Sequence, residues 1–419
     1  MTRPIRVLHA IASLEMGGEQ RYFVRLANRL DPAVFEQLVV YSGEDALRRE
    51  FAPQVRFLTL GATVPTVRHP ADLRAVPRMA RLLRAEQIDV VTTHGSGLPV
   101  LAAKAAAFVT GRPVIHTIQR PYGNRSRSED LIIRFAPLRR LVYGITDRYV
   151  ALGSYYADDQ ITRWKIPRDK IVLNYIGLDL AEFQVGAETR GEVRRELGLP
   201  DDAPLVGIVA RQVPVKGIAR GLRVFAALLA RMPQARLLNV GDGPQRVAFE
   251  VLARALGIAH AVLFAGSRQD STRLMSACDI VLQTTHNPLN GISSIEAMAA
   301  GRPIATVVGS EDEERMAADT CDEARNGCFV RTFELERSVD ALAAALADPA
   351  RLERMGQESR RMAEERFELG RHVAAVAALY RELAGRREPD ARDEPDARDA
   401  PDDNAAVAPP HGVAKEGVL

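Results

Sequence analysis

Three stretches of the 419-residue sequence combine glycine, cationic and carboxylate residues in a way that suits binding of a phosphorylated ligand. The first is Gly17-Gly18, which follows an apolar stretch at 5–11 and precedes a helical pattern at 19–30. Adjacent glycines let the backbone approach a ligand closely, and a helix N-terminus offers free N–H groups to an anion. A plain turn before a helix is the alternative. The usual dinucleotide fingerprint GxGxxG is absent here.

The second stretch is GIVARQVPVKG, in which Arg211 ends a strand pattern and Lys216 follows in a loop. Two cations at the carboxyl end of a parallel strand are suited to neutralise a pyrophosphate. The alternative is a pair of solvent-exposed basic residues, and this stretch alone favours neither interpretation.

The third stretch is THNPLNGISSIEAMAAGRPIATVVG, which follows an expected strand at 280–284 and contains the start of a helix. Asn290 could cap this helix, and the N–H groups of Gly291 and Ile292 would then face phosphate oxygens. Glu296 lies inside the helix among apolar neighbours, where a carboxylate needs partners. The two hydroxyls of a ribose would supply them; the alternative is an exposed helical glutamate.

Short apolar strands that alternate with helical patterns must position these residues. The expected strands are 5–11, 37–41, 55–60, 89–93, 113–118, 148–152 and 171–175, followed by 205–210, 236–240, 262–265, 280–284, 304–308 and 328–331. This pattern indicates parallel sheets covered on both faces. We expect an α/β fold of two doubly wound, Rossmann-like domains, 1–185 and 186–387, facing each other across a cleft. Ligands of such sheets bind at the carboxyl ends of strands, so the three stretches would meet there.

The composition excludes several classes of protein. Apolar residues make up 47% and charged residues 26% of the chain, as in soluble globular proteins. No run of about 20 uncharged apolar residues is present, which excludes a membrane-spanning helix. Three cysteines exclude a disulfide framework, and Cys321 and Cys328 lack partners at zinc spacing. Because there is also no signal-peptide pattern, we expect a cytoplasmic protein.

Charge is distributed unevenly along the chain. Residues 1–185 have a net charge of +8, residues 186–387 are neutral, and residues 388–419 have a net charge of −6. The basic part suggests anionic partners, although solvated arginines on helix surfaces are the alternative. The tail 388–419 repeats EPDARD and has few large apolar residues, so we expect it to be disordered and to have no catalytic role.

The segment 120–144 interleaves six arginines with apolar residues. It could form a basic amphipathic surface that binds anionic lipid or a lipid-linked acceptor, giving peripheral contact with the inner face of a membrane. A helix that packs its apolar side on its own sheet is the slightly favoured alternative. No zinc module, RNP-type motif or recognition helix is present, so we expect no nucleic-acid partner.

The order and spacing of these motifs resemble those of family 4 retaining glycosyltransferases, which have the GT-B fold. The resemblance covers roughly residues 5–385. Its segments are the Gly-Gly loop, DVVTTHGSG, IVLNYIGLDLAEF, the Arg211…Lys216 loop, LLNVGDGPQR and EAMAAGRP. It implies a nucleoside-diphosphate-sugar donor as substrate, no cofactor, and a glycan or lipid-linked acceptor. It also implies that the last helices, about 351–385, cross back to the first domain.

The resemblance further implies roles for single residues. Gly18, and with it Gly17, would approach the donor phosphates. Arg211 and Lys216 would bind the pyrophosphate as it leaves, and His94 would lie at the sugar-reacting cleft.

At the third stretch, Glu296 would hold the donor ribose beside Gly291 and Ile292. Family members usually carry another glutamate eight residues earlier, which contacts the donor sugar; Pro288 takes that position here. Gln119 stands where many members have a histidine after the fifth strand, and we expect it to line the substrate site. The nucleotide end of the site is therefore expected to be intact and the sugar end altered.

These observations lead to one expected function and one alternative. We expect a retaining transferase that moves a hexose-type sugar to an acceptor hydroxyl in bacterial glycan or glycolipid biosynthesis. No metal is needed, since Arg211, Lys216 and a helix N-terminus can stabilise the leaving charge. The alternative, suggested by Pro288 and Gln119, is a GT-B-like nucleotide-binding or scaffold protein with weak or no transfer activity. A nicotinamide dehydrogenase is disfavoured because its fingerprint is absent.

Overall fold

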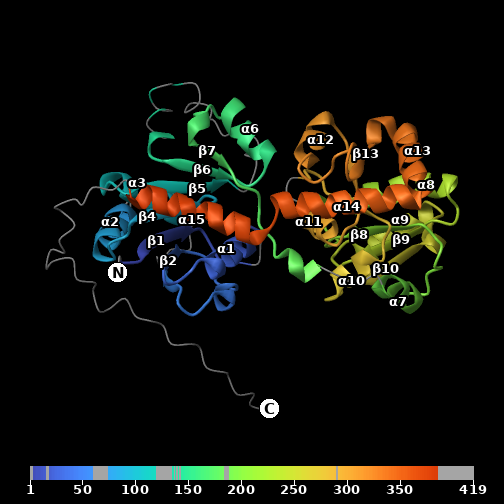
Figure 1. Ribbon diagram of the computed structural model, residues 1–419, viewed down its shortest axis with the longest axis horizontal. Coiled ribbons are helices and arrows are strands. Elements are labelled where there is room, and N and C mark those ends of the chain that lie inside the picture. Colours follow the sequence, from blue (N-terminus) through green and yellow to red (C-terminus); the bar gives the residue numbers. More distant parts are fainter. Residues whose placement is uncertain are drawn as a thin grey trace, which may run out of the picture.

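The computed structural model describes residues 3–15, 18–59, 74–118, 135, 137, 140, 143–183, 188–288 and 291–385. Figure 1 shows two α/β domains side by side, each built on a sheet with helices packed against it. The strand pairings among these residues are parallel in both sheets. The expected fold of two doubly wound domains is confirmed.

The sheet of the first domain has the strand order β3-β2-β1-β4-β5-β6-β7. Its strands are β1 (Ile5–Ile11), β2 (Phe35–Tyr41), β3 (Arg56–Thr59), β4 (Val90–His94), β5 (Val114–Ile118), β6 (Arg148–Ala151) and β7 (Ile171–Leu173). Strands are added outward in both directions from β1 and β4. The switch point of this sheet therefore lies at the carboxyl ends of these two strands, where doubly wound proteins bind ligands.

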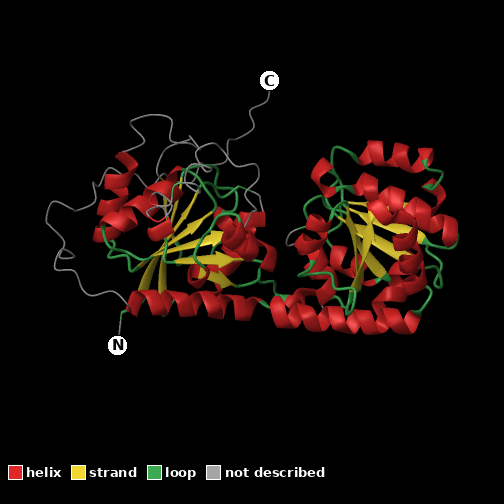
Figure 2. Cartoon of the chain, turned by 90° about the horizontal axis from the view of Figure 1, so that it is seen from above, coloured by secondary structure: helices red, strands yellow, loops and turns green. Residues whose placement is uncertain are grey.

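Helices cover the two faces of this sheet. They are α1 (Gly18–Arg29), α2 (Ala75–Ala85), α3 (Leu98–Val109), α6 (Ser154–Thr162) and α15 (Leu369–Gly385). Val7 and Ile11 share one hydrophobic cluster with α1 and α15, whereas Leu8 and Ala10 share another with α2 and α3. Successive residues of β1 thus face opposite layers, as the pleat requires. Figure 2 shows α15 along one side of the sheet, with other helices on the opposite side.

The sheet of the second domain has the order β10-β9-β8-β11-β12-β13, with its switch point between β8 and β11. Its strands are β8 (Leu205–Val209), β9 (Arg236–Val240), β10 (Val262–Gly266), β11 (Ile280–Gln283), β12 (Ile304–Val308) and β13 (Gly327–Arg331). Its helices are α7 (Glu188–Glu196), α8 (Ile218–Arg231), α9 (Arg246–Ala255), α10 (Ser271–Ser276), α11 (Ile292–Ala299), α12 (Glu311–Ala317), α13 (Leu335–Leu346) and α14 (Pro349–Arg366).

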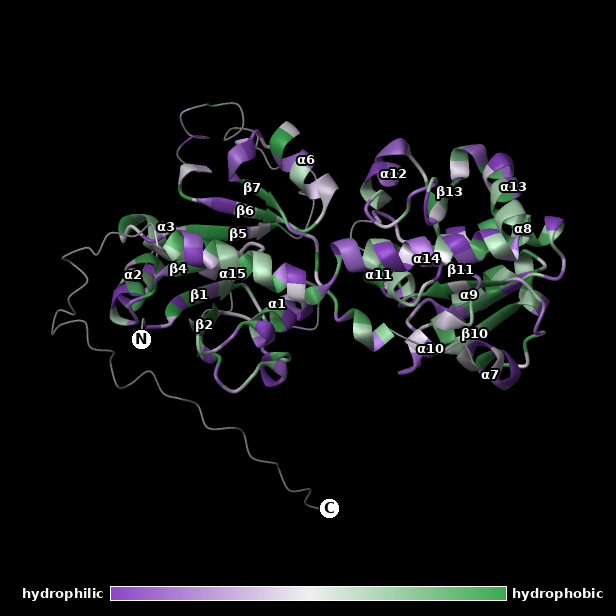
Figure 3. Cartoon of the chain, in the orientation of Figure 1, coloured by the Kyte–Doolittle hydropathy of each residue, from purple (hydrophilic) through white to green (hydrophobic). Residues whose placement is uncertain are grey.

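Two hydrophobic clusters hold this second sheet between its helix layers. α8, α9 and α13 contribute to one cluster, and α10, α11 and α12 contribute to the other. Figure 3 shows mostly hydrophobic strands inside both domains and mixed colouring on the helices that surround them. The strand sequences are continuous apolar runs because helices cover both faces of each sheet.

The end of the chain returns to the first domain. α14 lies on the second domain, and α15 follows it along the first (Figure 1). At the crossing, the N–H of Leu178 donates to Phe367 (2.8 Å), and the N–H of Leu369 donates to Leu178 (3.0 Å). Further along α15, the Thr92 hydroxyl donates to that of Tyr380 over 3.2 Å. α15 is therefore part of the core of the first domain.

A second set of contacts brings the carboxyl edges of the two sheets together. The buried Asp319, which follows α12, accepts the N–H of Ser154 at the start of α6 (2.7 Å). It also accepts the hydroxyl of Tyr175 (3.2 Å), beyond β7. These residues follow β12, β6 and β7, so both sheets point their carboxyl ends at the domain interface. No helix in the part of the chain described here is long and apolar enough to cross a membrane.

Candidate active site

The loop after β8 carries Arg211 and Lys216, and Gly217 fixes its position. Lys216 ends a short 3-10 helix, η5 (Pro214–Lys216), and Gly217 follows with φ +61°. A Cβ atom on Gly217 would lie 2.1 Å from the carbonyl oxygen of Thr284, so this approach requires glycine. The Thr284 hydroxyl donates to the Lys216 carbonyl over 2.7 Å. The loop after β8 is thereby held against the loop after β11, at the switch point.

Arg220, in the first turn of α8, strengthens this junction. Its guanidinium donates to the carbonyl oxygens of Thr284 (2.7 Å) and Thr285 (2.5 Å) and forms an ion pair with Glu313 (2.7 Å). Arg220 was not predicted from the sequence, because an arginine in an amphipathic helix usually indicates a solvated surface. Its only sequence signal is its place immediately after the Lys216-Gly217 turn.

Arg211 and Lys216 lie close enough to repel each other. Burial lowers the pKa of the Lys216 ammonium, and the Arg211 guanidinium lowers it further. Arg211 is exposed and Lys216 is half-buried. No carboxylate of a described residue lies within ion-pair distance of either group. Two neighbouring cations without a counter-ion are suited to bind a diphosphate.

The start of α11 lies against the end of β11, and the loop after β11 is bonded to the loop of Lys216. Gly291 precedes the helix, and a Cβ there would come within 2.3 Å of the Gln283 side-chain nitrogen. Gln283 donates to the Ser294 hydroxyl (3.0 Å) and accepts the N–H of Thr285 (3.0 Å), which holds the helix start to the strand end. The first N–H groups of a helix, beginning here with Ile292, have no acceptor within the helix and can bind an anion.

Glu296 is half-buried on α11 and faces the first domain. Burial raises the pKa of its carboxyl group. Arg25 of α1 lowers that pKa, and Glu182 of the short helix η4 (Leu180–Phe183) raises it, so both groups lie nearby. The apolar neighbours of Glu296 in the sequence predicted that its carboxylate would need partners, but nothing in the sequence pointed to Arg25 or Glu182. These two residues reach Glu296 only through the arrangement of the domains.

The loop after β9 contains the GDG part of the LLNVGDGPQR motif, for which the sequence predicted no structural role. Gly241 and Gly243 of the GDG sequence have φ +127° and +156°. A Cβ on Gly241 would lie 2.1 Å from the Ala210 carbonyl oxygen, and one on Gly243 would lie 2.6 Å from that of Gln212. Both glycines therefore let this loop pack directly against the backbone beside Arg211.

His94 ends β4, but its ring has no exposed surface. It stacks on Phe23 of α1 with ring centroids 4.4 Å apart, and its Nε2 lies 3.3 Å from Nδ1 of His9. Burial, with His9 beside it, lowers the pKa of His94 well below the usual value. The ring is therefore neutral and lies beneath α1, not at an open surface. A role at the reacting sugar stays a prediction, and it requires this ring to become accessible.

The remaining predicted site residues divide into two groups. Gly18 is the first residue of α1, at the carboxyl end of β1. Gly17, Gln119 and Asn290 lie outside the described residues, as do nearly all of 120–142 and the whole tail 388–419. Arg211 and Lys216 follow β8, and Gly291, Ile292 and Glu296 follow the neighbouring strand β11, whose loop is hydrogen-bonded to Lys216. His94 lies under α1.

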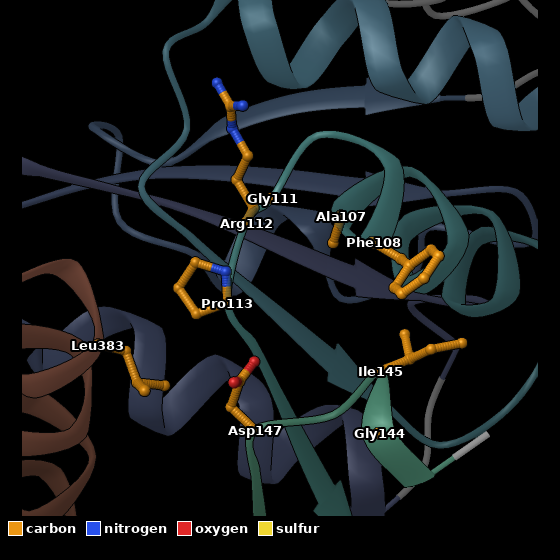
Figure 4. A pocket seen from close by; sticks show the side chains of 9 residues that line it. All are labelled: Ala107, Phe108, Gly111, Arg112, Pro113, Gly144, Ile145, Asp147 and Leu383. Carbon is orange, nitrogen blue, oxygen red and sulfur yellow. The ribbon is translucent and has the colours of Figure 1, made fainter. Parts of the chain in front are cut away.

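Two cavities lie at the other edges of the sheets. One of about 300 Å³ is bordered by Pro113 and Asp147, which precede β5 and β6, and by Leu383 of α15. Figure 4 shows Arg112 extending away from the other side chains of this pocket. A cavity of about 910 Å³ is bordered by Pro204 and Pro303, which precede β8 and β12. No group of three or more potential metal ligands occurs among the described residues.

Two protein-family models match most of the chain between them. Residues 16–182 match the model described as Glycosyltransferase Family 4, and residues 189–362 match Glycosyl transferases group 1. The two matches meet close to the start of α7, between the two sheets.

Curated relatives are transferases with different acceptors. The chain is 29% identical over 321 residues to a 2-deoxystreptamine N-acetyl-D-glucosaminyltransferase of Streptomyces fradiae, covering 69% of this chain and 74% of that protein. It is 35% identical over 223 residues to a D-inositol 3-phosphate glycosyltransferase of Nocardia farcinica, covering 50% of this chain and 47% of that protein. The chain thus spans three quarters of the first relative and about half of the second.

Solved structures show the same fold. HepE from Anabaena, solved in complex with UDP, aligns with a TM-score of 0.73 at 18% identity over 90% of this chain and all of that one. A glycosyltransferase from Rickettsia africae aligns with a TM-score of 0.74 at 17% identity over 92% of this chain and all of that one. With its two parallel sheets and both family matches, the chain is a glycosyltransferase of the group 1 and family 4 type with the GT-B fold.

Proposed function

We propose that this protein transfers a hexose-type sugar from a nucleoside-diphosphate-sugar to an acceptor hydroxyl with retention of configuration, in bacterial glycan or glycolipid biosynthesis. One observation carries the proposal. Arg211 and Lys216, which have no carboxylate of a described residue within ion-pair distance, lie in a loop that is hydrogen-bonded to the loop leading to α11, the helix that carries Glu296. This set fits a nucleoside diphosphate, with cations and helix N–H groups for the phosphates and a carboxylate for the ribose.

The same groups would assist bond cleavage. As the bond from the anomeric carbon to the diphosphate oxygen breaks, negative charge grows on the leaving phosphate. Lys216, Arg211 and the first N–H groups of α11 stabilise that charge without a metal ion. The acceptor hydroxyl attacks the same face of the sugar and loses its proton, for which the departing diphosphate is a suitable base.

The nucleotide sugars named for similar proteins support the choice of donor. HepE has been solved with UDP-glucose, while a relative from Mycolicibacterium smegmatis is a GDP-mannose-dependent phosphatidylinositol monomannoside mannosyltransferase. We therefore propose a uridine or guanosine diphosphate sugar as donor and a glycan or lipid-linked acceptor. His94, Gln119, Gly17, Gly18 and Asn290 remain predicted substrate-site residues.

A thermal-shift screen of UDP, GDP, ADP and their sugars tests donor binding. A ligand at 100 times its Kd stabilises the native state by about 2.7 kcal/mol, a clear rise in melting temperature. The donor so identified is then incubated with acceptor mixtures and a chelator, and the anomeric configuration of the product is read by NMR. Retained configuration with chelator present supports the proposal; an inverted product, or loss of activity with chelator, contradicts the corresponding part.

A nucleotide-binding scaffold with weak or no transfer activity is the second candidate. Pro288 favours it, because this buried residue occupies the position of the glutamate that would contact the donor sugar. A scaffold would bind nucleoside diphosphate but would neither hydrolyse nor transfer from its sugar. Binding without turnover over a broad acceptor range would therefore favour this candidate.

A further inference from the structure

We propose that α12 couples a contact between the two domains to the donor loop, residues 211–217, so that Tyr155 of the first domain helps to position Lys216 of the second. Glu313 on α12 and Arg220 on α8 are the positioning residues that connect them. The inference rests on the proposed function, because it takes the donor loop to be the place where the donor phosphates bind.

The first link is the contact between α6 and α12, which face each other where the two domains meet (Figure 1). The Tyr155 hydroxyl of α6 donates to the Asp312 carboxylate of α12 over 3.0 Å. Arg315, three residues further along α12, forms an ion pair with Asp312 at 3.3 Å. The Arg315 guanidinium also lies over the Tyr155 ring, 5.8 Å from its centroid. A hydrogen bond, an ion pair and a cation–π contact thus hold α12 against the first domain.

The second link is Glu313, the residue next to Asp312. Its carboxylate forms an ion pair with Arg220 at 2.7 Å and accepts the N–H of Gly309 over 2.9 Å. Only 11% of the Arg220 side chain and 20% of the Glu313 side chain are exposed. An ion pair shielded from solvent in this way is costly to break, because one charge is then left buried without its partner. A displacement of α12 would therefore displace Arg220.

The third link joins Arg220 to the donor loop. Its guanidinium donates to the carbonyl oxygens of Thr284 (2.7 Å) and Thr285 (2.5 Å), which follow β11. The Thr284 hydroxyl in turn donates to the Lys216 carbonyl over 2.7 Å. Polar contacts and the short helix α12 therefore form one continuous connection from Tyr155 to the backbone of Lys216, and coupling between sites is carried by connections of this kind.

Such coupling acts in both directions. If the contact at Tyr155 stabilises the loop conformation that binds diphosphate, bound diphosphate must stabilise the contact at Tyr155 by the same factor. The first domain would then be held most firmly against the second when a donor is bound. Coupling between two sites typically changes affinity by about fivefold to 150-fold, and we expect the lower end because the Tyr155–Asp312 bond is exposed to solvent.

Two pairs of variants of the full chain test the connection. Tyr155→Phe removes the hydrogen bond to Asp312. Its control, Tyr175→Phe, removes another hydrogen bond between the same two domains, from the Tyr175 hydroxyl to Asp319 (3.2 Å). Both tyrosines are half-buried. Among the described residues, the Asp319 carboxylate has no hydrogen bond to Arg220 or to the donor loop, so the control leaves the connection intact.

Glu313→Gln breaks the connection in its middle, and Glu314→Gln is the matched control. Glu314 is the next residue of α12, is also half-buried, and pairs with Arg331 at 2.7 Å. Arg331 ends β13, and its side chain has no hydrogen bond to the donor loop within the described part of the chain. Both substitutions therefore remove one shielded ion pair from the same helix, but only Glu313→Gln separates α12 from Arg220.

Titration calorimetry measures the effect on donor binding, with UDP, GDP or ADP as the ligand, whichever gives the largest thermal shift. Tyr155→Phe should bind it about fivefold more weakly than the parent, Glu313→Gln at least about tenfold more weakly, and both controls as tightly as the parent. Affinity for the corresponding nucleoside should be unchanged in all four variants, because Lys216 contacts only the phosphates. The double variant of Tyr155 and Glu313 should lose no more affinity than Glu313→Gln alone, since both changes interrupt one connection.

Hydrogen exchange without nucleotide gives a second readout. The N–H groups of Lys216 and Gly217 donate to backbone carbonyls inside the donor loop, and the N–H of His286 donates to the carbonyl of Val215 (3.0 Å). These amides should exchange faster in Tyr155→Phe and Glu313→Gln than in the parent, because the loop is held less firmly. In the two controls they should exchange as in the parent, even where the melting temperature falls.

Equal exchange of these amides in each variant and its control would overturn the proposal. Equal affinity for the nucleoside diphosphate in each variant and its control would overturn it as well. A parent that binds none of UDP, GDP and ADP would instead contradict the proposed function, and hydrogen exchange would then decide alone whether α12 couples the domain contact to the loop.

Discussion

Replacement of Gly217 by alanine tests how the donor loop is held in place. The new Cβ would lie 2.1 Å from the Thr284 carbonyl oxygen, about 1 Å closer than real contacts allow. Alanine at φ +61° costs about 1–2 kcal/mol by itself. Separation of the two loops would also break the 2.7 Å bond between Thr284 and Lys216, worth about 1 kcal/mol.

Gly198→Ala is the matched control. Gly198 has φ +64°, but a Cβ there meets no atom within 4 Å. Gly198→Ala therefore has the free-energy cost of alanine in a left-handed backbone conformation, but no steric clash. The free energy of unfolding of Gly217→Ala should be lower than that of Gly198→Ala by at least about 1 kcal/mol. For a domain of this size, this corresponds to about 2–4 °C in melting temperature.

Scanning calorimetry and titration calorimetry measure both effects. Gly217→Ala should melt below the control, and it should bind nucleoside diphosphate at least about tenfold more weakly, because one charge-assisted contact is worth about 1.5–3 kcal/mol. Equal melting and equal affinity in the two variants would refute the idea that close contact at Gly217 positions Lys216.

Three further predictions concern other parts of the chain. Pro288→Glu should leave turnover unchanged or lower it if the sugar pocket has been rebuilt around other groups; a clear gain in a donor-hydrolysis assay would show a merely damaged site. Lys104→Met should stabilise the protein, because burial lowers the Lys104 pKa from 10.5 to about 7. The cost of burying the ammonium, several kcal/mol, is full below pH 7 and shrinks towards pH 10, so the gain in melting temperature should shrink over the same range. Deletion of 388–419 should change neither melting temperature nor transfer, and a large fall in melting temperature would show that this segment packs.

Local sequence pattern was enough to predict the two sheets and the loops that follow β8 and β11. Strand boundaries followed from apolar runs, and the expected 304–308 is the observed β12 (Ile304–Val308). The loop with Arg211 and Lys216 and the helix with Glu296 were found because each lies directly after a strand. In a doubly wound sheet, the order of the strands alone places the loops after β8 and β11 at one switch point. Their neighbourhood could therefore be predicted without knowledge of contacts between distant side chains.

Side-chain surroundings set by tertiary packing were not predictable. His94 ends β4, one residue beyond the expected strand 89–93, and its ring stacks on Phe23 of α1. The neighbours of Glu296 come from α1 and η4, across the domain interface. Arg25 lies in an ordinary amphipathic helix, so the sequence around it does not indicate that it lies near Glu296.

Titration calorimetry of Lys216→Ala and Glu296→Ala tests the placement of the donor most directly. The ligands are the nucleoside diphosphate that gives the largest thermal shift and its free nucleoside. Lys216→Ala should lose about tenfold to hundredfold in affinity for the diphosphate and none for the nucleoside, since it removes one charge-assisted phosphate contact. Glu296→Ala should weaken both ligands alike, because it contacts the ribose. If Lys216→Ala binds the diphosphate as tightly as the parent, the donor does not lie where we place it.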